Sequence, residues 1–425
     1  MNIAIISPEF PPFTNWGGIA TFNLGLAQIL SSLGYKVFVF TCNPSDTLRK
    51  IDNKDKFTVI YVPFKTENKI FNFIYYRIPF GVIRSFLKRF IPHLIFVIDW
   101  NVFSLLYFRE YHKKYKFDAI HSPSYDFPAF LIRLFYKEPI SYLYLQGLQS
   151  SINKYNRPNT DDRLLSLLEH KFIQFKTGRY IACSKNVKDY VSKLFPQLSE
   201  NVSILPNFID PNIYINYKKL NSNNLIHFGR LEYRKGVDLL IRAFATLARK
   251  DRNIKLFLIG DKKNNFLVRN TKVSFDQFLG TLKIPQNIFE RIFVFPRFDQ
   301  KETLIELLTN LKGIAVFPSR HEPFGLTTIE AMAMGFIVIA SNKGGGKEII
   351  KHGKNGFLTS PGQDEILNSL RQVRNLNSAE IKKITSSAII TVKEKYSYEK
   401  AKANIQKFLK PIHKTNTHII SGTEK

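Results

Sequence analysis

The stretch "SRHEPFGLTTIEAMAMG" at 319–335 joins a predicted strand to a predicted helix, and it places two glutamates eight positions apart. Pro323 disfavours helix before the Phe-Gly step, so the helix is predicted to begin near Gly325. Glu322 then lies in the loop and Glu330 lies in the helix. Two carboxylates on one strand-to-helix connection indicate a ligand site at the end of that strand.

The start of this helix provides groups that can bind a ligand. The backbone N–H groups of Phe324, Gly325 and Leu326 have no partner within the helix, so they are available to oxygen atoms. The Glu330 carboxylate can accept two hydroxyl hydrogens, as from a ribose. We therefore expect the two glutamates to have different functions and not to form a general acid and base pair.

The surrounding sequence alternates strands and helices, which predicts a parallel sheet covered on both faces. The second half contains predicted strands 225–229, 254–260, 292–296, 313–319 and 336–341, with a polar insertion at 261–287. The first half contains predicted strands 3–7, 36–42, 119–122, 140–146 and 179–184. The Pro- and Asx-rich segment 203–214 predicts a linker between the two halves.

The fold class predicted from this pattern is α/β, with two Rossmann-like doubly wound domains that face each other across a cleft. The domains are expected at 1–205 and 206–395, followed by an amphipathic helix at 396–415. A length of 425 residues suits two domains. Ligands bind at the carboxyl ends of the strands in such sheets, so the loops that follow the strands are the candidate site.

The loop after the first strand contains Gly17 and Gly18, just before a predicted helix. Glycines there allow close approach of a ligand to the backbone, and the helix start can bind an anion. An ordinary tight turn is the alternative. The loop matches neither G-x-G-x-x-G nor the Walker pattern, which argues against a dehydrogenase or a P-loop enzyme.

The stretch "GRLEYRKG" at 229–236 follows the first strand of the second half. Arg230 comes directly after the strand, and Lys235 precedes a helix start. Two cations and a helix N-terminus on one loop predict a diphosphate site. The alternative is that both are ordinary solvated residues.

The net charge of +28 indicates an anionic partner: a nucleotide, a nucleic acid or an anionic membrane. A generally basic surface is the alternative. Cys42 and Cys183 each end an apolar run and are expected to be buried thiols. Neither has the spacing of a metal site, so no metal is predicted. The N-terminal sequence predicts a strand and not a signal peptide, so a cytoplasmic location is expected.

Two segments bear on membrane contact. The basic aromatic stretch at 69–90 is compatible with peripheral binding to the inner face of the plasma membrane, although a packed helix with a basic face is an equal alternative. The apolar stretch at 91–108 contains His93, Asp99 and Asn101, which favours a core helix over a membrane span.

These motifs together resemble one family. "EPFGLTTIE" matches the E-x7-E signature of retaining glycosyltransferases with the GT-B fold, and the chain resembles their family 4, also called glycosyl transferases group 1. The resemblance covers nearly the whole chain, including the Gly17-Gly18 loop, "LPNFID", "GRLEYRKG" and "NKGGGKEIIKHGKNGFL". It implies a nucleotide-sugar donor, a UDP- or GDP-sugar, and a glycan or lipid-linked acceptor, in cell-surface polysaccharide or lipopolysaccharide synthesis.

The resemblance also assigns expected roles. Glu322 would contact the donor sugar, Glu330 would hold the ribose, and Arg230 and Lys235 would neutralise the departing diphosphate. The remaining donor contacts would be Gly17, Gly18 and the backbone of Phe324, Gly325 and Leu326. The C-terminal helix would cross back to the first domain. Transfer would proceed at the front face with retention, without a protein nucleophile, a cofactor or an obligatory metal.

One position departs from the family. Gln146 stands where relatives often have His, so it can contact a sugar but cannot carry a proton at neutral pH. His121, nearby in the predicted topology, is expected to be a core or supporting residue. Alternatives remain open: a GT-B protein with little or no turnover, a GT-B sugar-nucleotide epimerase, or a nucleic-acid-binding protein. The last has no recognised binding motif, so no nucleic-acid partner is predicted.

Overall fold

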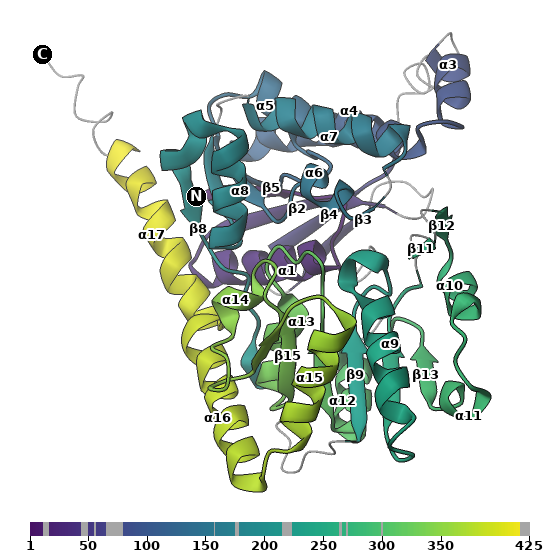
Figure 1. Cartoon of the computed structure of the whole chain (residues 1–425). Coiled ribbons are helices and arrows are strands. Elements are labelled where there is room, and N and C mark those ends of the chain that lie inside the picture. Colours follow the sequence, from purple (N-terminus) through teal and green to yellow (C-terminus); the bar gives the residue numbers. More distant parts are fainter. Residues whose placement is uncertain are drawn as a thin grey trace, which may run out of the picture.

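The computed structural model describes residues 1–11, 17–43, 50–54, 57–64, 80–156, 158–174, 178–214, 223–262, 266–268, 271–298 and 301–416. Within these residues the chain forms two α/β domains, one above the other in Figure 1, with a long C-terminal helix along one side. The predicted fold class, two doubly wound domains, is confirmed.

The first domain is built on a sheet of eight described strands in the order β3-β4-β2-β1-β5-β6-β7-β8. All neighbouring strands are parallel except β3 and β4, which are antiparallel. The strands are β1 (Asn2–Ile6), β2 (Lys36–Cys42), β3 (Lys50–Lys54), β4 (Phe57–Val62), β5 (Ala119–Pro123), β6 (Ile140–Leu145), β7 (Arg179–Ala182) and β8 (Val202–Ile204).

The helices of the first domain pack around this sheet. They are α1 (Gly18–Ser32), α3 (Phe80–Leu87), α4 (Pro92–Tyr115), α5 (Phe130–Phe135), α6 (Gln149–Asn153), α7 (Thr160–Gln174) and α8 (Lys185–Leu194), with the 3-10 turns η1 (Pro196–Asn201) and η2 (Pro211–Ile213). The predicted core helix at 91–108 is confirmed, because Trp100, Phe103 and Phe108 of α4 are buried. None of the described helices has an apolar stretch sufficient to span a bilayer.

The second domain has a fully parallel sheet in the order β13-β10-β9-β14-β15-β16. Its strands are β9 (Asn224–Phe228), β10 (Lys255–Ile259), β13 (Ile292–Phe295), β14 (Ile314–Phe317), β15 (Ile337–Ser341) and β16 (Phe357–Thr359). Its helices include η3 (Tyr233–Lys235), α9 (Val237–Ala248), α12 (Lys301–Leu311), α13 (Leu326–Ala333), α14 (Gly346–Ile349), α15 (Gln363–Arg374) and α16 (Ser378–Lys395).

Some elements differ from the sequence prediction. The insertion at 261–287 is not merely polar loop, because it holds the hairpin β11 (Phe266–Val268) and β12 (Thr271–Val273), then α10 (Phe275–Thr281) and the start of α11 (Gln286–Phe289). Strands β3, β4 and β16 were not predicted, and β8 overlaps the predicted linker. Ser274 and Gln277 form a capping box that stabilises α10 and was visible in the sequence as S-x-x-Q.

The C-terminal helix α17 (Tyr398–Asn416) leaves the second domain and runs along α1 of the first (Figure 1). Tyr398 Oη donates to Gln28 Oε1 at 3.1 Å, and Arg179 Nη1 donates to the carbonyl of Phe408 at 2.8 Å. The linker contacts the residues just before α17, because Ile209 N donates to the Tyr396 carbonyl at 2.9 Å. The two segments that cross between the domains, the linker and the start of α17, are therefore hydrogen-bonded to each other. Cys42 and Cys183 are buried free thiols, as expected.

Candidate active site

The loops at the carboxyl ends of the two sheets touch each other. A Cβ atom on Gly18 would lie 3.1 Å from Leu326 Cδ1, and one on Gly147 would lie 2.7 Å from Pro323 Cγ. The Ser184 hydroxyl, which caps α8, donates to the carbonyl of Pro323 at 2.7 Å. The loop after β14 is thus in contact with three loops of the first domain, and these glycines permit the approach.

Glu322 and Lys235, predicted separately from two motifs, form a direct ion pair. Lys235 Nζ lies 2.5 Å from Glu322 Oε2, and their side chains are 15% and 18% exposed. Burial would raise the pKa of Glu322, but the charges of Lys235 and Arg234 outweigh burial and lower it. Glu322 is therefore held ionised, with its own cation, where the resemblance places a donor sugar.

Lys235 is not the ordinary solvated residue that the sequence left open as the alternative, because its side chain is 15% exposed. Burial lowers the pKa of Lys235, and Glu322 opposes that shift. The lysine is held by η3, whose following residue, Gly236, has a φ of 70° and lies so close to the Pro318 carbonyl that a Cβ would be 2.1 Å away. Only glycine fits this position, which explains the Lys-Gly step of the motif.

Arg230 follows β9 and is exposed between the domains. The surrounding protein removes water from the guanidinium, which would lower the pKa of Arg230. The charges of Glu232, Tyr125, Glu9 and Glu322 outweigh this and raise that pKa. Within the described part of the chain its guanidinium forms no ion pair. A cation that the described residues leave without an ion pair, and that interacts electrostatically with Tyr125 of the other domain, is suited to an anionic ligand held between the two.

The three amide groups predicted from the Pro-Phe-Gly loop are open. Among the described residues, the N–H groups of Phe324, Gly325 and Leu326 donate no hydrogen bond to the protein. Gly325 is the N-cap of α13 with a φ of 111°, and the Phe324 side chain is buried against Tyr396. A Cβ on Gly345 would lie 2.1 Å from the Phe324 carbonyl oxygen, so the backbone at Gly345 packs directly against this loop.

Glu330 has two partners that the sequence did not reveal. Tyr214 Oη donates to Glu330 Oε1 at 3.0 Å, and Lys301 Nζ lies 3.4 Å from the same oxygen. Lys301 also lies 4.9 Å from the centre of the Tyr214 ring. Tyr214 belongs to the end of the linker, so the carboxylate expected to hold the ribose is connected to the segment that joins the domains. No local pattern marks either partner, because 116 positions separate Tyr214 from Glu330.

The remaining predicted residues, Gly17, Gln146 and His121, lie in the first domain. Gly17 is the N-cap of α1 and has an ordinary φ of −67°, so it needs no glycine-specific conformation. Gln146 is half-buried after β6, next to Gly147. His121 is a core residue, as expected: its Nδ1 lies 2.8 Å from Tyr144 Oη, and burial lowers the pKa of His121 to about 3.

Two further arginines support the donor-side loops. Arg234 is buried, pairs with Glu232 at 2.5 Å and donates to the carbonyl of His321 at 3.0 Å. Arg320 makes two hydrogen bonds to Asp238, at 2.6 and 2.7 Å. These bidentate and buried contacts fix the geometry of the loop that carries Glu322.

Two family models together match most of the chain. Residues 16–213 match the model described as Glycosyltransferase Family 4, and residues 212–384 match the one described as Glycosyl transferases group 1. An uncharacterised glycosyltransferase of Methanocaldococcus jannaschii is 27% identical over 383 residues, which is 85% of each chain. A glycogen synthase of Mycobacterium tuberculosis is 30% identical over 188 residues, 43% of this chain and 41% of the synthase.

Solved structures show the same fold. A sucrose-phosphate synthase from Thermosynechococcus elongatus superposes with a TM-score of 0.74 at 19% identity, covering 97% of this chain and 99% of that one. The Anabaena protein HepE, in complex with UDP-glucose, gives 0.65 at 18% identity, covering 97% and 100%. Two facing doubly wound domains of this kind form the GT-B fold. The chain belongs to glycosyltransferase family 4.

Proposed function

We propose that this protein transfers a sugar, with retention, from a UDP- or GDP-sugar to a glycan or lipid-linked acceptor of a cell-surface polysaccharide or lipopolysaccharide. The observation that carries the proposal is the ionised Glu322–Lys235 pair, at 2.5 Å, beside the open amides of 324–326. A carboxylate can accept sugar hydroxyl hydrogens, and the amides and cations suit phosphate oxygens. Arg230 supplies a second cation from the loop that also carries Lys235.

The charges of this site support a reaction that needs no metal. The leaving nucleoside diphosphate gains negative charge as the glycosidic bond breaks. Lys235, held by Glu322, and Arg230 on the same loop are cations that can stabilise this charge. Glu330, with Tyr214 and Lys301, would hold the ribose in both the ground state and the transition state.

Ligand-dependent thermal stability tests the donor. A nucleotide at about 100 times its dissociation constant adds roughly 2.7 kcal/mol to stability. We expect UDP or GDP, and the corresponding nucleotide sugars, to raise the melting temperature, and the Glu330→Ala variant to lose most of that shift. Proton NMR of the transfer product tests retention, because donor and product should share the anomeric configuration. Inversion would overturn the retaining assignment, and release of an epimerised free sugar would favour the epimerase alternative.

We also propose that the protein binds an anionic bilayer through the first domain. Of the segment 69–90, residues 69–79 lie outside the described residues. After them, Ile83, Phe86 and Phe90 are 56%, 65% and 60% exposed, next to the exposed cations Lys88 and Arg89. Arg84 fixes α3 to α4 through Asp99. Exposed aromatic and basic residues on α3 and the turn that follows it suit an anionic lipid surface.

Vesicle sedimentation tests the membrane proposal. The protein should bind vesicles that contain phosphatidylglycerol and should not bind pure phosphatidylcholine. The double variant Phe86→Ser, Phe90→Ser should lose binding and keep donor hydrolysis. The matched double variant Leu167→Ser, Leu168→Ser alters exposed apolar residues on α7 and should bind as the wild type does. Equal binding by both double variants would exclude α3 as the membrane contact.

A further inference from the structure

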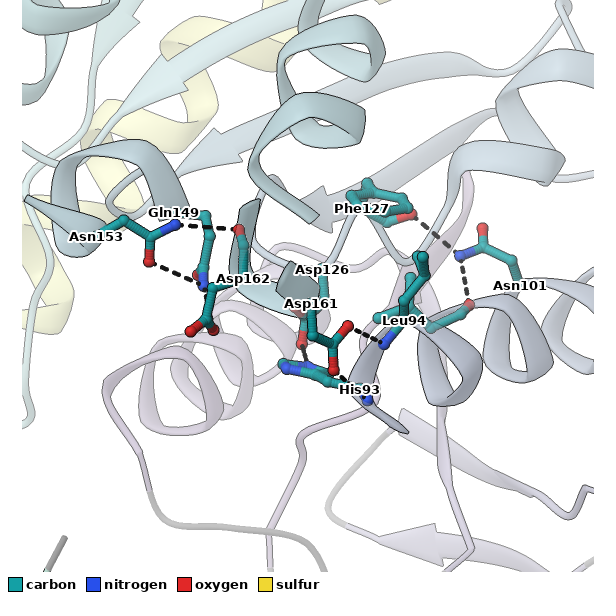
Figure 2. Close-up of polar contacts among 10 residues, drawn as sticks. His93, Leu94, Asn101, Asp126, Phe127, Gln149, Asn153, Asp161 and Asp162 are labelled. Atoms are coloured by element: carbon teal, nitrogen blue, oxygen red, sulfur yellow. Dashed lines mark hydrogen bonds and ion pairs between the residues drawn. The ribbon is translucent and has the colours of Figure 1, made fainter. Parts of the chain in front are cut away.

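A histidine–aspartate pair on the first domain lies outside the residues that the family motifs single out. His93 is at the start of α4, and its Nε2 lies 2.9 Å from Asp126 Oδ2 (Figure 2). Asp126 is in the loop after β5, with a φ of 59°. The His93 side chain is 37% exposed and that of Asp126 is 14% exposed. Within the described residues, His93 Nδ1 has no hydrogen-bond partner.

The backbone that carries His93 is held rigidly. Asp161 at the start of α7 is buried, and its two carboxylate oxygens accept from His93 N at 2.7 Å and from Leu94 N at 2.9 Å. These bonds satisfy two N–H groups at the first turn of α4. Figure 2 shows Asp126 and Asp161 converging on this residue from two different segments. The imidazole is therefore fixed from both its ring and its backbone.

A buried amide lies beside this pair. Gln149 Nε2 is 3.5 Å from Asp162 Oδ1 and equally far from Asn153 Oδ1. Gln149 is only 7% exposed, yet its Oε1 has no hydrogen-bond partner among the described residues. A buried acceptor without a donor is costly unless a ligand or water satisfies it. Asp162, the partner of Gln149, also interacts electrostatically with His93, so this amide and His93 belong to one polar cluster.

The cluster is connected to the donor-side loops at two points. Tyr125, the neighbour of Asp126, interacts electrostatically with Arg230 of the second domain. On the other side, His321 Nε2 lies 3.2 Å from Ser151 Oγ, and Ser151 is on α6 together with Gln149. His321 is the residue before Glu322. The polar cluster and the Glu322–Lys235 pair therefore flank the same junction between domains.

We propose that the His93–Asp126 pair positions the acceptor: His93 Nδ1 donates a hydrogen bond to an oxygen of an uncharged sugar, and Gln149 Oε1 accepts a hydroxyl hydrogen from it. This inference rests on the proposed glycosyl transfer. Three carboxylates surround one imidazole, so the cluster disfavours a phosphate and favours neutral hydroxyl groups. His93 is a positioning residue, and no proton transfer through it is required.

The charge state of His93 supplies a distinctive readout. Burial would lower the pKa of His93, but its hydrogen bond to Asp126 and the charges of Asp126, Asp161 and Asp162 raise it. No cation is among these facing groups. The protonated imidazole donates from Nδ1, so acceptor binding is complete below this raised pKa. Binding weakens as the pH rises through it.

Steady-state kinetics on the full-length protein test the proposal. The acceptors are octyl β-glucoside, octyl β-galactoside and octyl N-acetyl-β-glucosaminide, with glucose 6-phosphate as the charged comparison, and the donor is the nucleotide sugar that the wild type hydrolyses. For the best octyl glycoside, His93→Gln should raise the acceptor KM about 10-fold or more, the scale for losing a charge-assisted hydrogen bond. Asp126→Asn should act in the same direction. Hydrolysis of the donor without acceptor should stay within about twofold, because the donor contacts are untouched.

The pH profile and a control variant complete the test. The acceptor KM of the wild type should rise with pH, and that of His93→Gln should be flat. His352→Gln, a histidine remote on the second domain, should keep the wild-type profile. Unchanged acceptor KM in folded His93→Gln, no transfer to any octyl glycoside, or better transfer to glucose 6-phosphate would each overturn the proposal. Absence of donor hydrolysis in the wild type would instead overturn the proposed function.

Discussion

The two domains present polar pairs of different character at their junction. The second domain carries Glu322–Lys235 and Glu330–Lys301, in which a carboxylate meets an ammonium group within one domain. The first domain carries His93–Asp126, in which a carboxylate meets an imidazole. The cations beside Glu322 lower the pKa of that carboxylate, while the carboxylates around His93 raise the pKa of its imidazole.

This difference separates two tasks. A permanent cation is suited to the charge that develops on a departing diphosphate, which must be stabilised in each turnover. A titratable pair surrounded by carboxylates is suited to neutral hydroxyl groups. A change in its protonation or sequence can alter acceptor binding without altering donor binding. We expect donor chemistry and acceptor binding to respond separately to mutation, and the following changes test that separation.

The largest expected effect is that of Lys235→Ala. Removing one preorganised cation from the transition state should lower turnover about 10²- to 10³-fold. The change also leaves Glu322 without its partner, so stability should fall by about 1–3 kcal/mol. Steady-state kinetics and urea unfolding measure the two effects. Lys262→Ala removes an exposed lysine that pairs with Asp276 at 2.9 Å, and it should change neither. Near-normal turnover in folded Lys235→Ala would contradict the diphosphate role.

Glu330→Ala should act mainly on donor affinity. A ribose contact is similar before and during bond breaking, so its loss raises the donor KM and leaves turnover nearly unchanged. The expected rise is about 10- to 100-fold, the scale of hydrogen bonds to a charged group. Glu290→Ala, on an exposed helix, is the control. A fall in turnover without a change in donor KM would show that this glutamate acts on the reacting bond.

Tyr214→Phe should give a smaller change of the same kind. It removes one hydrogen bond of 3.0 Å to Glu330 and keeps the ring. Isothermal titration with the nucleoside diphosphate should show about 2- to 10-fold weaker binding. A loss as large as that of Glu330→Ala would mean that the tyrosine itself contacts the ligand.

The smallest expected effect on catalysis is that of Glu348→Ala. The Glu348 carboxylate of the second domain accepts from Lys185 N at 2.9 Å and from Asn186 N at 2.8 Å, at the start of α8 in the first domain. This exposed contact stabilises the observed arrangement of the two domains by about 0.3–1 kcal/mol. Small-angle scattering should show a larger radius of gyration for the variant, and nucleoside diphosphate should restore compaction. An identical radius without ligand would show that closure does not depend on this contact.

The donor side could be predicted from sequence because its residues cluster in short motifs. Glu322, the three amides and Glu330 fall within nine consecutive residues, and Arg230 and Lys235 share one loop. Strand-to-helix connections of this kind are readable from local pattern alone. The same logic predicted the two parallel sheets, since their buried strands are continuous apolar runs.

The other contacts could not be predicted because distant segments form them. His93, Asp126 and Asp161 come from three separate segments, so no local pattern brings them together. Tyr214 and Lys301 meet Glu330 only after the linker and α12 are in place. The burial of Lys235 was missed for the same reason, because a loop position does not reveal what packs over it.

The central claim is that the second domain cleaves a nucleotide sugar with its own cations in place of a metal. The most direct measurement is release of nucleoside diphosphate from UDP- and GDP-sugars, in EDTA and in Mg²⁺, by wild type and by Lys235→Ala. We predict that the wild type releases diphosphate from at least one donor at equal rates in EDTA and Mg²⁺, and that the variant is slower by about 10²-fold or more in both. Release only in Mg²⁺, or no release from any donor, would contradict the account.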